Sequence, residues 1–145
     1  MLTQGMAKKL MDHQLVPSAD TLLVPGEGFV DVKRTHELWN NTFLANKSLA
    51  KRDGWVDDAS VGIPDLYVIS GMTLAEALAR QGKTAASDSV FLSAKAVARA
   101  MKREAIFGID RMQGMPVAPG DTAIAPLLTA PPAAPAPAPP PAKKP

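Results

Sequence analysis

Proline is distributed very unevenly along this chain. Eleven of its fourteen prolines lie between Pro116 and Pro145, and the last fifteen residues contain only proline, alanine and lysine. Because proline lacks the backbone N–H that helices and sheets use, such a sequence forms no helix or ladder. We therefore expect 109–145 to be an extended arm, in polyproline II geometry or without regular structure. Only the residues before it can build a core, which suits one small domain.

The charged residues are nearly balanced, with sixteen lysines and arginines against fourteen aspartates and glutamates and a net charge of +2. A nucleic-acid-binding protein needs its basic residues concentrated on one face. Here they occur as scattered pairs such as Lys33-Arg34 and Lys102-Arg103, so no nucleic-acid partner is expected. The chain contains no cysteine, which excludes disulfides, thiol chemistry and thiolate metal sites.

Hydrophobic segments are short throughout the chain. None reaches the run of about 18 apolar residues that a membrane-spanning helix requires, so no direct membrane span is expected. Residues 1–15 lack the apolar region and the small-residue cleavage site of a signal peptide. On this ground alone, a cytoplasmic location is favoured.

The first part of the chain carries three short apolar groups. Two methionines and a leucine recur at helical spacing and predict a short helix over 4–14. The apolar runs 22–24 and 29–32 follow, on either side of a Pro-Gly-Glu-Gly turn. Such short runs fit strands or extended packing segments equally well, and both interpretations stay open.

A longer helix is predicted after Asp31. The carboxylate of Asp31 makes this residue a good N-cap, because it can accept hydrogen bonds from the free backbone N–H groups of the first turn. From 33 to about 51, apolar residues including Trp39 and Phe43 follow one stripe, with charged residues outside it. Gly54 ends this predicted helix.

Two helices separated by a glycine form the clearest pattern. Pro64 fits the first turn of a helix over 64–81, because its missing N–H is not needed there. Gly82 is expected at the C′ position in a left-handed conformation. A second helix over 85–102 begins after Thr84 as its N-cap, and the short connection forces an antiparallel hairpin. The expected packing residues are Leu66 and Ile69 on the first helix, and Leu74, Ala75, Leu78, Gly82, Phe91 and Ala94 at the hairpin interface.

This hairpin resembles a tetratricopeptide repeat, in which small residues bring two helices close together. The chain departs from the repeat at three places. Gly71 stands where the repeat has a bulky aromatic residue, Ser87 stands where it has an alanine, and no proline follows near Arg99. An ordinary helical hairpin in a small bundle is the alternative. In either case the hairpin is too small to be stable alone, so it must pack on the helix of 33–51 or on a partner.

The wider region 21–102 resembles the soluble C-terminal region of bacterial multi-pass membrane proteins related to protein O-mannosyltransferases. The resemblance rests on FVDVKRT at 29–35, WVD at 55–57, VGIP at 61–64 and the hairpin that follows. In that family this region is a helical-repeat appendage on the extracytoplasmic side, and acidic residues of the membrane part carry out the transfer chemistry. The matching region has no counterpart of that part, so the resemblance implies a periplasmic location and protein contacts without catalysis.

No arrangement of residues predicts an active site. His13 and His36 lie on different predicted elements, without metal-ligand spacing near either. Asp57-Asp58 fits a solvated turn, because adjacent loop side chains usually point apart. The glycines at 26–28 lack the third glycine of a dinucleotide fingerprint and the lysine of a P-loop, and no G-x-S-x-G occurs. We therefore expect no enzyme activity, no cofactor, no metal and no small-molecule substrate.

Candidate protein contacts lie in two places. Phe29, Trp39 and Trp55 belong to the aromatic cluster of the chain, and they either build the small core or stay exposed as interface anchors. The arm is the second place, because a polyproline segment loses little conformational entropy when it binds. Its candidate contact residues are Pro131, Pro132, Pro135, Pro137, Pro139, Pro140 and Pro141.

Together these patterns predict a mainly α protein: an N-terminal helix and extended segment at 1–28, a helical body at 29–108 with a TPR-like hairpin at 64–102, and the arm at 109–145. The favoured function is a non-catalytic accessory or scaffolding subunit that binds protein subunits on the periplasmic face of a bacterial membrane complex. A photosynthetic reaction centre with its light-harvesting antenna is the most specific version of this hypothesis. The alternatives are a detached periplasmic recognition domain of a glycosyltransferase-like membrane protein and a TPR-like peptide-binding adaptor.

Overall fold

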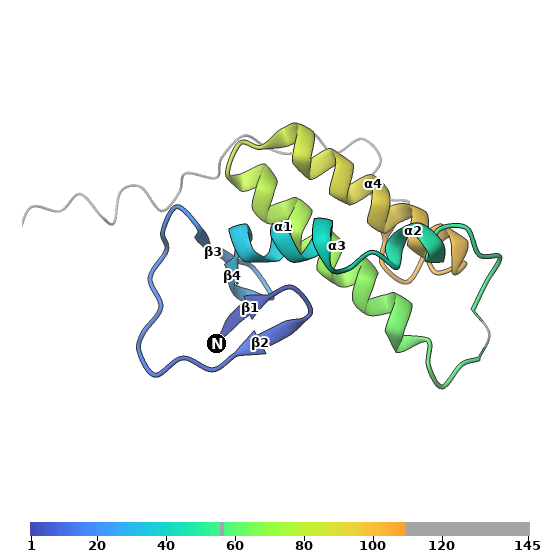
Figure 1. The fold of residues 1–145 in the computed structure, drawn as a ribbon, viewed down its shortest axis with the longest axis horizontal. Helices are drawn as coiled ribbons and strands as arrows, with labels where there is room; N and C mark the ends of the chain where they lie inside the picture. Colours follow the sequence, from blue (N-terminus) through green and yellow to red (C-terminus); the bar gives the residue numbers. More distant parts are fainter. Residues whose placement is uncertain (56, 110–145) are drawn as a thin grey trace, which may run out of the picture.

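The computed structural model describes residues 1–55 and 57–109, and Figure 1 shows α3 and α4 side by side in opposite directions with α1 against them. The expectation of a mainly helical fold is correct for the helical body only. The N-terminal residues form a four-stranded mixed sheet in place of the expected helix and extended segment. The elements in chain order are β1 (Leu2–Gln4), β2 (Ala7–Lys9), β3 (Thr21–Val24), β4 (Gly28–Asp31), α1 (Val32–Asn41), α2 (Asn46–Leu49), α3 (Gly62–Arg80) and α4 (Thr84–Ala100).

The predicted helix over 4–14 is wrong. This segment contains the β1–β2 hairpin, which turns at Gly5 with a φ of +64°. A left-handed conformation of this kind suits glycine and breaks a helix. β1 also pairs in parallel with β4, so that Leu2 lies opposite Phe29 and Thr3 opposite Val30. This pairing joins segments far apart in the sequence, and local helical spacing gives no sign of it.

The sheet has the strand order β2-β1-β4-β3. The runs 22–24 and 29–32, for which strands and extended segments were both open, contribute to the antiparallel pair β3–β4. Gly26 and Gly28 in the connecting turn have φ values of +83° and +88°. One face of the sheet buries Val24 and Val30 against the helices. The predicted boundary between 28 and 29 therefore falls inside β4.

The start of α1 confirms the predicted N-cap. One oxygen of Asp31, Oδ1, accepts a hydrogen bond from the backbone N–H of Arg34 at 2.9 Å. The other oxygen, Oδ2, accepts one from Nε2 of Gln4 at 3.0 Å. The same carboxylate therefore caps the helix and ties it to β1.

The predicted single helix over 33–51 is wrong in its second half. The backbone N–H groups of Thr42 and Phe43 both donate to the carbonyl oxygen of Leu38 at 2.8 Å, and α1 ends there. The chain then turns before the short helix α2 brings Leu49 into the core. The apolar spacing continues through the break, so the spacing alone suggested an unbroken helix.

The helical hairpin is confirmed, with ends that differ from the prediction by two residues or fewer. Gly82 has a φ of +74°, its N–H donates to the carbonyl of Ala79, and the N–H of Lys83 donates to that of Leu78. These two bonds form a Schellman motif. Thr84 is the first helical residue, and Lys83 takes the N-cap position without a side-chain bond. Leu74, Ala75, Leu78 and Ala94 are buried, Phe91 is half-buried, and Leu66 and Ile69 are exposed.

Two groups of buried residues form the core. The sheet-side cluster consists of Val24, Val30, Val32, Trp39, Leu74, Ala75, Ala77, Leu78 and Val90. The loop-side cluster consists of Leu49, Val68, Val97, Ala98, Met101 and Ile109. Tyr67 and Phe91 pack against both clusters and join them. Ile109, which the prediction assigned to the arm, is fully buried, so the body extends at least this far. The rest of the predicted arm lies outside the described residues.

Candidate interaction surfaces

Trp39 reaches from α1 to the interface between α3 and α4. A Cβ atom on Gly71 would lie 2.7 Å from Cη2 of Trp39 and 2.7 Å from Cβ of Ala94. Real carbon atoms do not approach so closely, so only glycine leaves room here for the indole ring. The space beside Gly71 is thus filled by an aromatic ring from another helix. Trp39 is only 4% exposed and belongs to the core.

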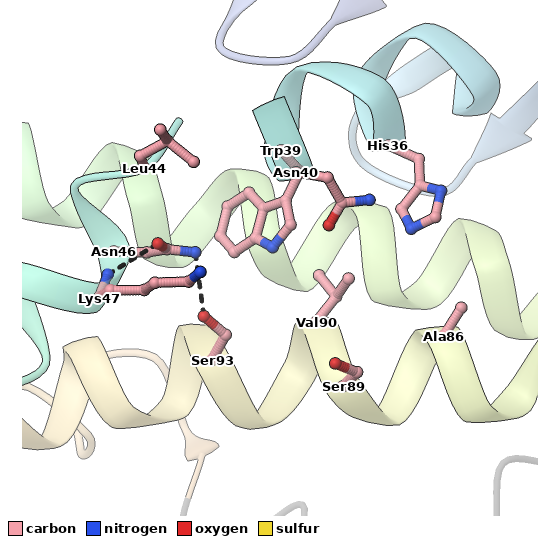
Figure 2. A pocket seen from close by; sticks show the side chains of 10 residues that line it. All are labelled: His36, Trp39, Asn40, Leu44, Asn46, Lys47, Ala86, Ser89, Val90 and Ser93. Carbon is pink, nitrogen blue, oxygen red and sulfur yellow. Dashed lines mark hydrogen bonds between the residues drawn. The ribbon is translucent and has the colours of Figure 1, made fainter. Parts of the chain in front are cut away.

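A cavity of about 310 Å³ lies beside this contact, between the α1–α2 segment and α4 (Figure 2). We refer to it as the α1–α4 groove. Its floor is partly apolar, and polar side chains line the rest. The lining residues are His36, Trp39, Asn40, Leu44, Asn46, Lys47, Ala86, Ser89, Val90 and Ser93.

Asn46 holds one end of the groove together. Its side chain is buried, and Nδ2 donates a hydrogen bond to Oγ of Ser93 at 3.1 Å. Its Oδ1 accepts the backbone N–H of Lys47 at 2.7 Å. This amide links α2 to α4 at that end of the groove.

The indole N–H of Trp39 faces the groove. Figure 2 shows the nitrogen on the side of the ring toward Asn40 and Val90. The remaining lining side chains include the donors of Asn40, Lys47 and Ser89, and no carboxylate lines the groove. Asn40 and Ser89 can also accept hydrogen bonds, so the groove presents polar groups of both kinds.

A second surface lies on the outer side of α3. Ile63, Leu66 and Ile69 are 52%, 47% and 41% exposed, and their spacing of three residues puts them along one side of the helix. We call this set the α3 stripe. A shallow hollow of about 100 Å³ beside it is lined by Leu66, Ile69 and, from the β1–β2 turn, Met6. An ion pair of 3.4 Å between Lys8 and Glu27 borders the hollow.

Sequence reasoning missed the α3 stripe. It placed Leu66 and Ile69 on the packed side of the helix, but both are exposed. Apolar residues occur on most sides of α3, so their spacing does not show which side faces the core. In the structure, α3 packs on α4, α1 and β3, and these contacts leave Leu66 and Ile69 exposed.

Trp55 lies in a different setting from Trp39. It is half-buried, and its indole N–H donates to Oγ of Ser60 at 2.8 Å. The Ser60 hydroxyl donates to Oδ2 of Asp57 at 2.5 Å, and the Ser60 backbone N–H donates to Oδ1 at 2.9 Å. Both bonds lower the pKa of Asp57 below its ordinary value, and the bond from the Ser60 hydroxyl has the larger effect. The guanidinium of Arg52 lies 5.3 Å above the Trp55 ring.

The other predicted contact residues are placed as follows. Phe29 is half-buried on β4, where it lies opposite Leu2 on one side and Leu23 on the other. The seven arm prolines from 131 to 141 fall outside the described residues. Of the three aromatic candidates, Trp39 is a core residue, while Phe29 and Trp55 each keep part of their surface exposed.

In the part of the chain that the structure describes, the ionisable side chains do not converge on a common site. His13 is exposed and lies 2.7 Å from Asp12, whereas His36 is half-buried in the α1–α4 groove. Within the described ranges, no group of three or more His, Cys, Asp and Glu side chains gathers as metal ligands. Asp65 receives two hydrogen bonds from Arg103, at 2.7 and 2.6 Å, which raise the pKa of that guanidinium and tie the start of α3 to the segment after α4.

None of the helices in the described part has the length and apolar character needed to cross a membrane. A scan against protein-family models, a search of curated proteins and a search of solved structures each find no match to this chain. The function must therefore be argued from the two surfaces, the α1–α4 groove and the α3 stripe.

Proposed function

We propose that this protein is a non-catalytic accessory subunit that docks on a larger, membrane-associated assembly. The observation that carries the proposal is the α3 stripe. Three large aliphatic side chains on one side of a helix, each about half exposed, expose apolar surface that water solvates poorly. Apolar side chains gathered on one side of a helix favour contact with another protein.

The stripe has the composition of a small contact site. Ile63, Leu66 and Ile69 form an apolar centre, and the charged pair Lys8–Glu27 stands at its margin. Interfaces commonly combine an apolar centre with a polar rim. Complete burial of the exposed halves of the three side chains would contribute roughly 3 kcal/mol, at about 2 kcal/mol for a fully buried aliphatic side chain. The stripe can therefore support docking but needs further contacts for tight binding.

We propose a non-catalytic role because of where the charged residues lie. In the described part of the chain, ion pairs such as Arg34–Glu37 on α1 and Arg80–Glu76 on α3 lie on the surface. Each joins neighbouring turns of its own helix. Reaction centres of enzymes instead bring ionisable groups with shifted pKa values together in a cavity. This arrangement supports a binding role.

The identity of the assembly comes from the sequence resemblance. Regions similar to 21–102 are extracytoplasmic appendages of membrane proteins related to protein O-mannosyltransferases. The proposal therefore includes a bacterial membrane complex contacted from its periplasmic face. A photosynthetic reaction centre with its antenna is the most specific form of the proposal, and this form does not follow from the resemblance. A peptide-binding adaptor is the second candidate, and the polar α1–α4 groove favours it.

Affinity purification from solubilised membranes of the source organism tests the docking role. We compare the wild type with Leu66→Lys/Ile69→Lys, and use Leu92→Lys as the control because Leu92 is also exposed, at 63%, but lies on α4. The wild type and the control should bring down subunits of one membrane complex, and the stripe variant should lose them about tenfold or more. Equal recovery by all three proteins, or a wild type that purifies alone, would contradict the proposal. Circular dichroism checks that each variant is folded.

A further inference from the structure

We propose that the open edge of the sheet, at β2, receives an extended segment of the docking partner as an added strand, and that this strand covers the α3 stripe. The inference rests on the docking function proposed above and names the form of the partner. β2 lies at one end of the strand order β2-β1-β4-β3 and pairs only with β1, and all three of its side chains are exposed. A strand with one unpaired edge is a template for another strand.

The opposite edge of the sheet, at β3, is closed by the chain itself. The backbone N–H of Ser18 donates to the carbonyl of Thr21 at 2.8 Å, and the N–H of Thr21 donates to Oγ of Ser18 at 3.1 Å. These two bonds use the backbone groups that Thr21 would otherwise offer to a further strand. Strand addition is therefore directed to β2.

The backbone of Lys8 is free to pair at this open edge. Gln4 and Ala7 flank a two-residue turn and so form a hydrogen-bonded pair, and the next pair, Thr3 and Lys8, is of the non-hydrogen-bonded kind. The N–H and the carbonyl of Lys8 consequently point away from β1. Among the residues that the structure describes, no group outside the sheet bonds to either of them. An added strand would satisfy both.

The sheet runs along α3 and stops short of the start of this helix. At the β3 end, Nε2 of Gln81 donates to the carbonyl of Ala19 at 2.7 Å. At the β2 end, Lys8 lies beside Leu66 and Ile69 around the shallow hollow. Neighbouring strands are about 4.8 Å apart, which equals about three residues of a helix that rises about 1.5 Å per residue. A strand added to β2 would therefore lie nearer the start of α3, over the exposed α3 stripe.

The two faces of the added strand would meet different surroundings. Lys8 and its partner Thr3 line the hollow, so every second residue of the added strand would face α3 and meet apolar side chains. The residues between them would face the other side, beside the exposed Lys9. The fitting segment therefore alternates aliphatic and acidic residues. The β2 strand of a second copy fits poorly, because it would set lysines opposite lysines.

NMR titration of the full-length chain at low salt tests the proposal. The probe is a short capped peptide in which glutamate and valine alternate. It should shift the backbone amide signal of Lys8 and the methyl signals of Leu66, and leave the amide of Ser89 on α4 unchanged. A matched peptide with lysine in place of glutamate should bind at least about tenfold more weakly. The proposal is overturned if Lys8 shows no shift, or if both peptides bind equally well.

Two changes test pairing through the backbone. Methylation of alternate amide nitrogens blocks one edge of the peptide at a time, so one methylated form should bind like the parent and the other at least about tenfold more weakly. Equal binding of both forms would contradict strand addition, and this comparison needs no protein variant. In the protein, Lys8→Pro removes the free N–H without removing a bond to β1, and should weaken peptide binding about tenfold. Lys8→Thr keeps the N–H and should not remove this part of the binding.

The affinity purification described above separates this inference from the docking function. The Lys8→Pro variant should lose the membrane complex, as Leu66→Lys/Ile69→Lys should. If the stripe variant loses the complex and Lys8→Pro keeps it, the docking function stands and strand addition is wrong. A wild type that purifies alone would contradict the docking function itself.

Discussion

The two core clusters are closed in different ways. Regular elements close the sheet-side cluster: strands, α1 and the hairpin meet there, and Trp39 fits against Gly71. Loops close the loop-side cluster, where the N–H of Gly54 donates to the carbonyl of Ala100 at 2.7 Å and Lys102 adopts a φ of +57°. The first region depends on the shapes of apolar side chains. The second depends on backbone hydrogen bonds and on strained or charged residues at its surface.

Each region contains one tryptophan, and the two side chains play different parts. The ring of Trp39 is buried by close contact, and its nitrogen lies on the side of the ring toward Asn40 and Val90. The ring of Trp55 is half-buried, and its N–H is used within its own loop by Ser60. Because burial is the larger contribution to stability, the comparison predicts that Trp39 matters more to the fold than Trp55 does.

The largest expected effect is that of Trp39→Ala. Removing this ring leaves a cavity between three helices and should lower the free energy of unfolding by about 3–5 kcal/mol. Trp55→Ala removes one hydrogen bond and a side chain that is only half-buried. It should therefore lower the free energy of unfolding by only about 1–2 kcal/mol. Urea unfolding followed by circular dichroism measures both. Equal losses would show that the two regions are not held differently.

A medium effect is expected at the end of α4. Lys102 occupies the left-handed position of a Schellman motif, in which its N–H donates to Arg99 and that of Arg103 donates to Ala98. Glycine adopts this conformation without the strain that a Cβ atom causes. Lys102→Gly should therefore raise the free energy of unfolding by roughly 0.5–1 kcal/mol.

The ion pair that this substitution removes, from Lys102 to Asp53, is almost fully exposed and contributes little. Lys102→Ala serves as the matched control, because it also removes the charge but keeps the Cβ atom. Only the glycine variant should unfold at a higher urea concentration. A gain of the same size in the alanine variant would assign the effect to the lost charge and not to the backbone.

The smallest expected effect concerns the pH dependence of the Trp55 loop. The pKa of Asp57 is lowered in the folded protein, from an ordinary value of 3.8, by the hydrogen bonds from Ser60. A carboxylate with a lowered pKa stabilises the fold above its ordinary pKa, and this contribution is lost as the pH falls below that value. The indole N–H signal of Trp55 should therefore shift when the pH is lowered from 5 toward 2 (about the range of acid titration). Asp57→Asn should remove this titration, and Asp58→Asn should keep it.

Local signals in the sequence predicted the parts of the fold that single residues determine. Asp31 begins α1 and Gly82 ends the turn after α3, because a carboxylate cap and a left-handed glycine act within one turn of chain. The β1–β4 pairing was missed, since it depends on contacts between distant segments. The break after Asn41 was missed because the apolar spacing continues through it into α2.

The candidate surfaces were harder to predict than the helices. Gly71 was recognised as a departure from the repeat pattern, but its reason is a ring from α1 that the pattern does not include. The α3 stripe became visible only once the sheet was placed beside it. The α1–α4 groove was not predicted, because it requires α1, α2 and α4 together.

Everything proposed for the groove and the stripe assumes that the indole of Trp39 lies against Gly71 and fixes α1 on the hairpin. Urea unfolding of Gly71→Ala beside Gly62→Ala tests this contact most directly, because both glycines lie in α3 and a Cβ on Gly62 would meet nothing within 4 Å. Gly62→Ala should raise the free energy of unfolding by about 0.5 kcal/mol through helix propensity. Gly71→Ala should lower it by about 1–3 kcal/mol through overpacking. If Gly71→Ala is as stable as Gly62→Ala, the ring does not lie where the structure places it.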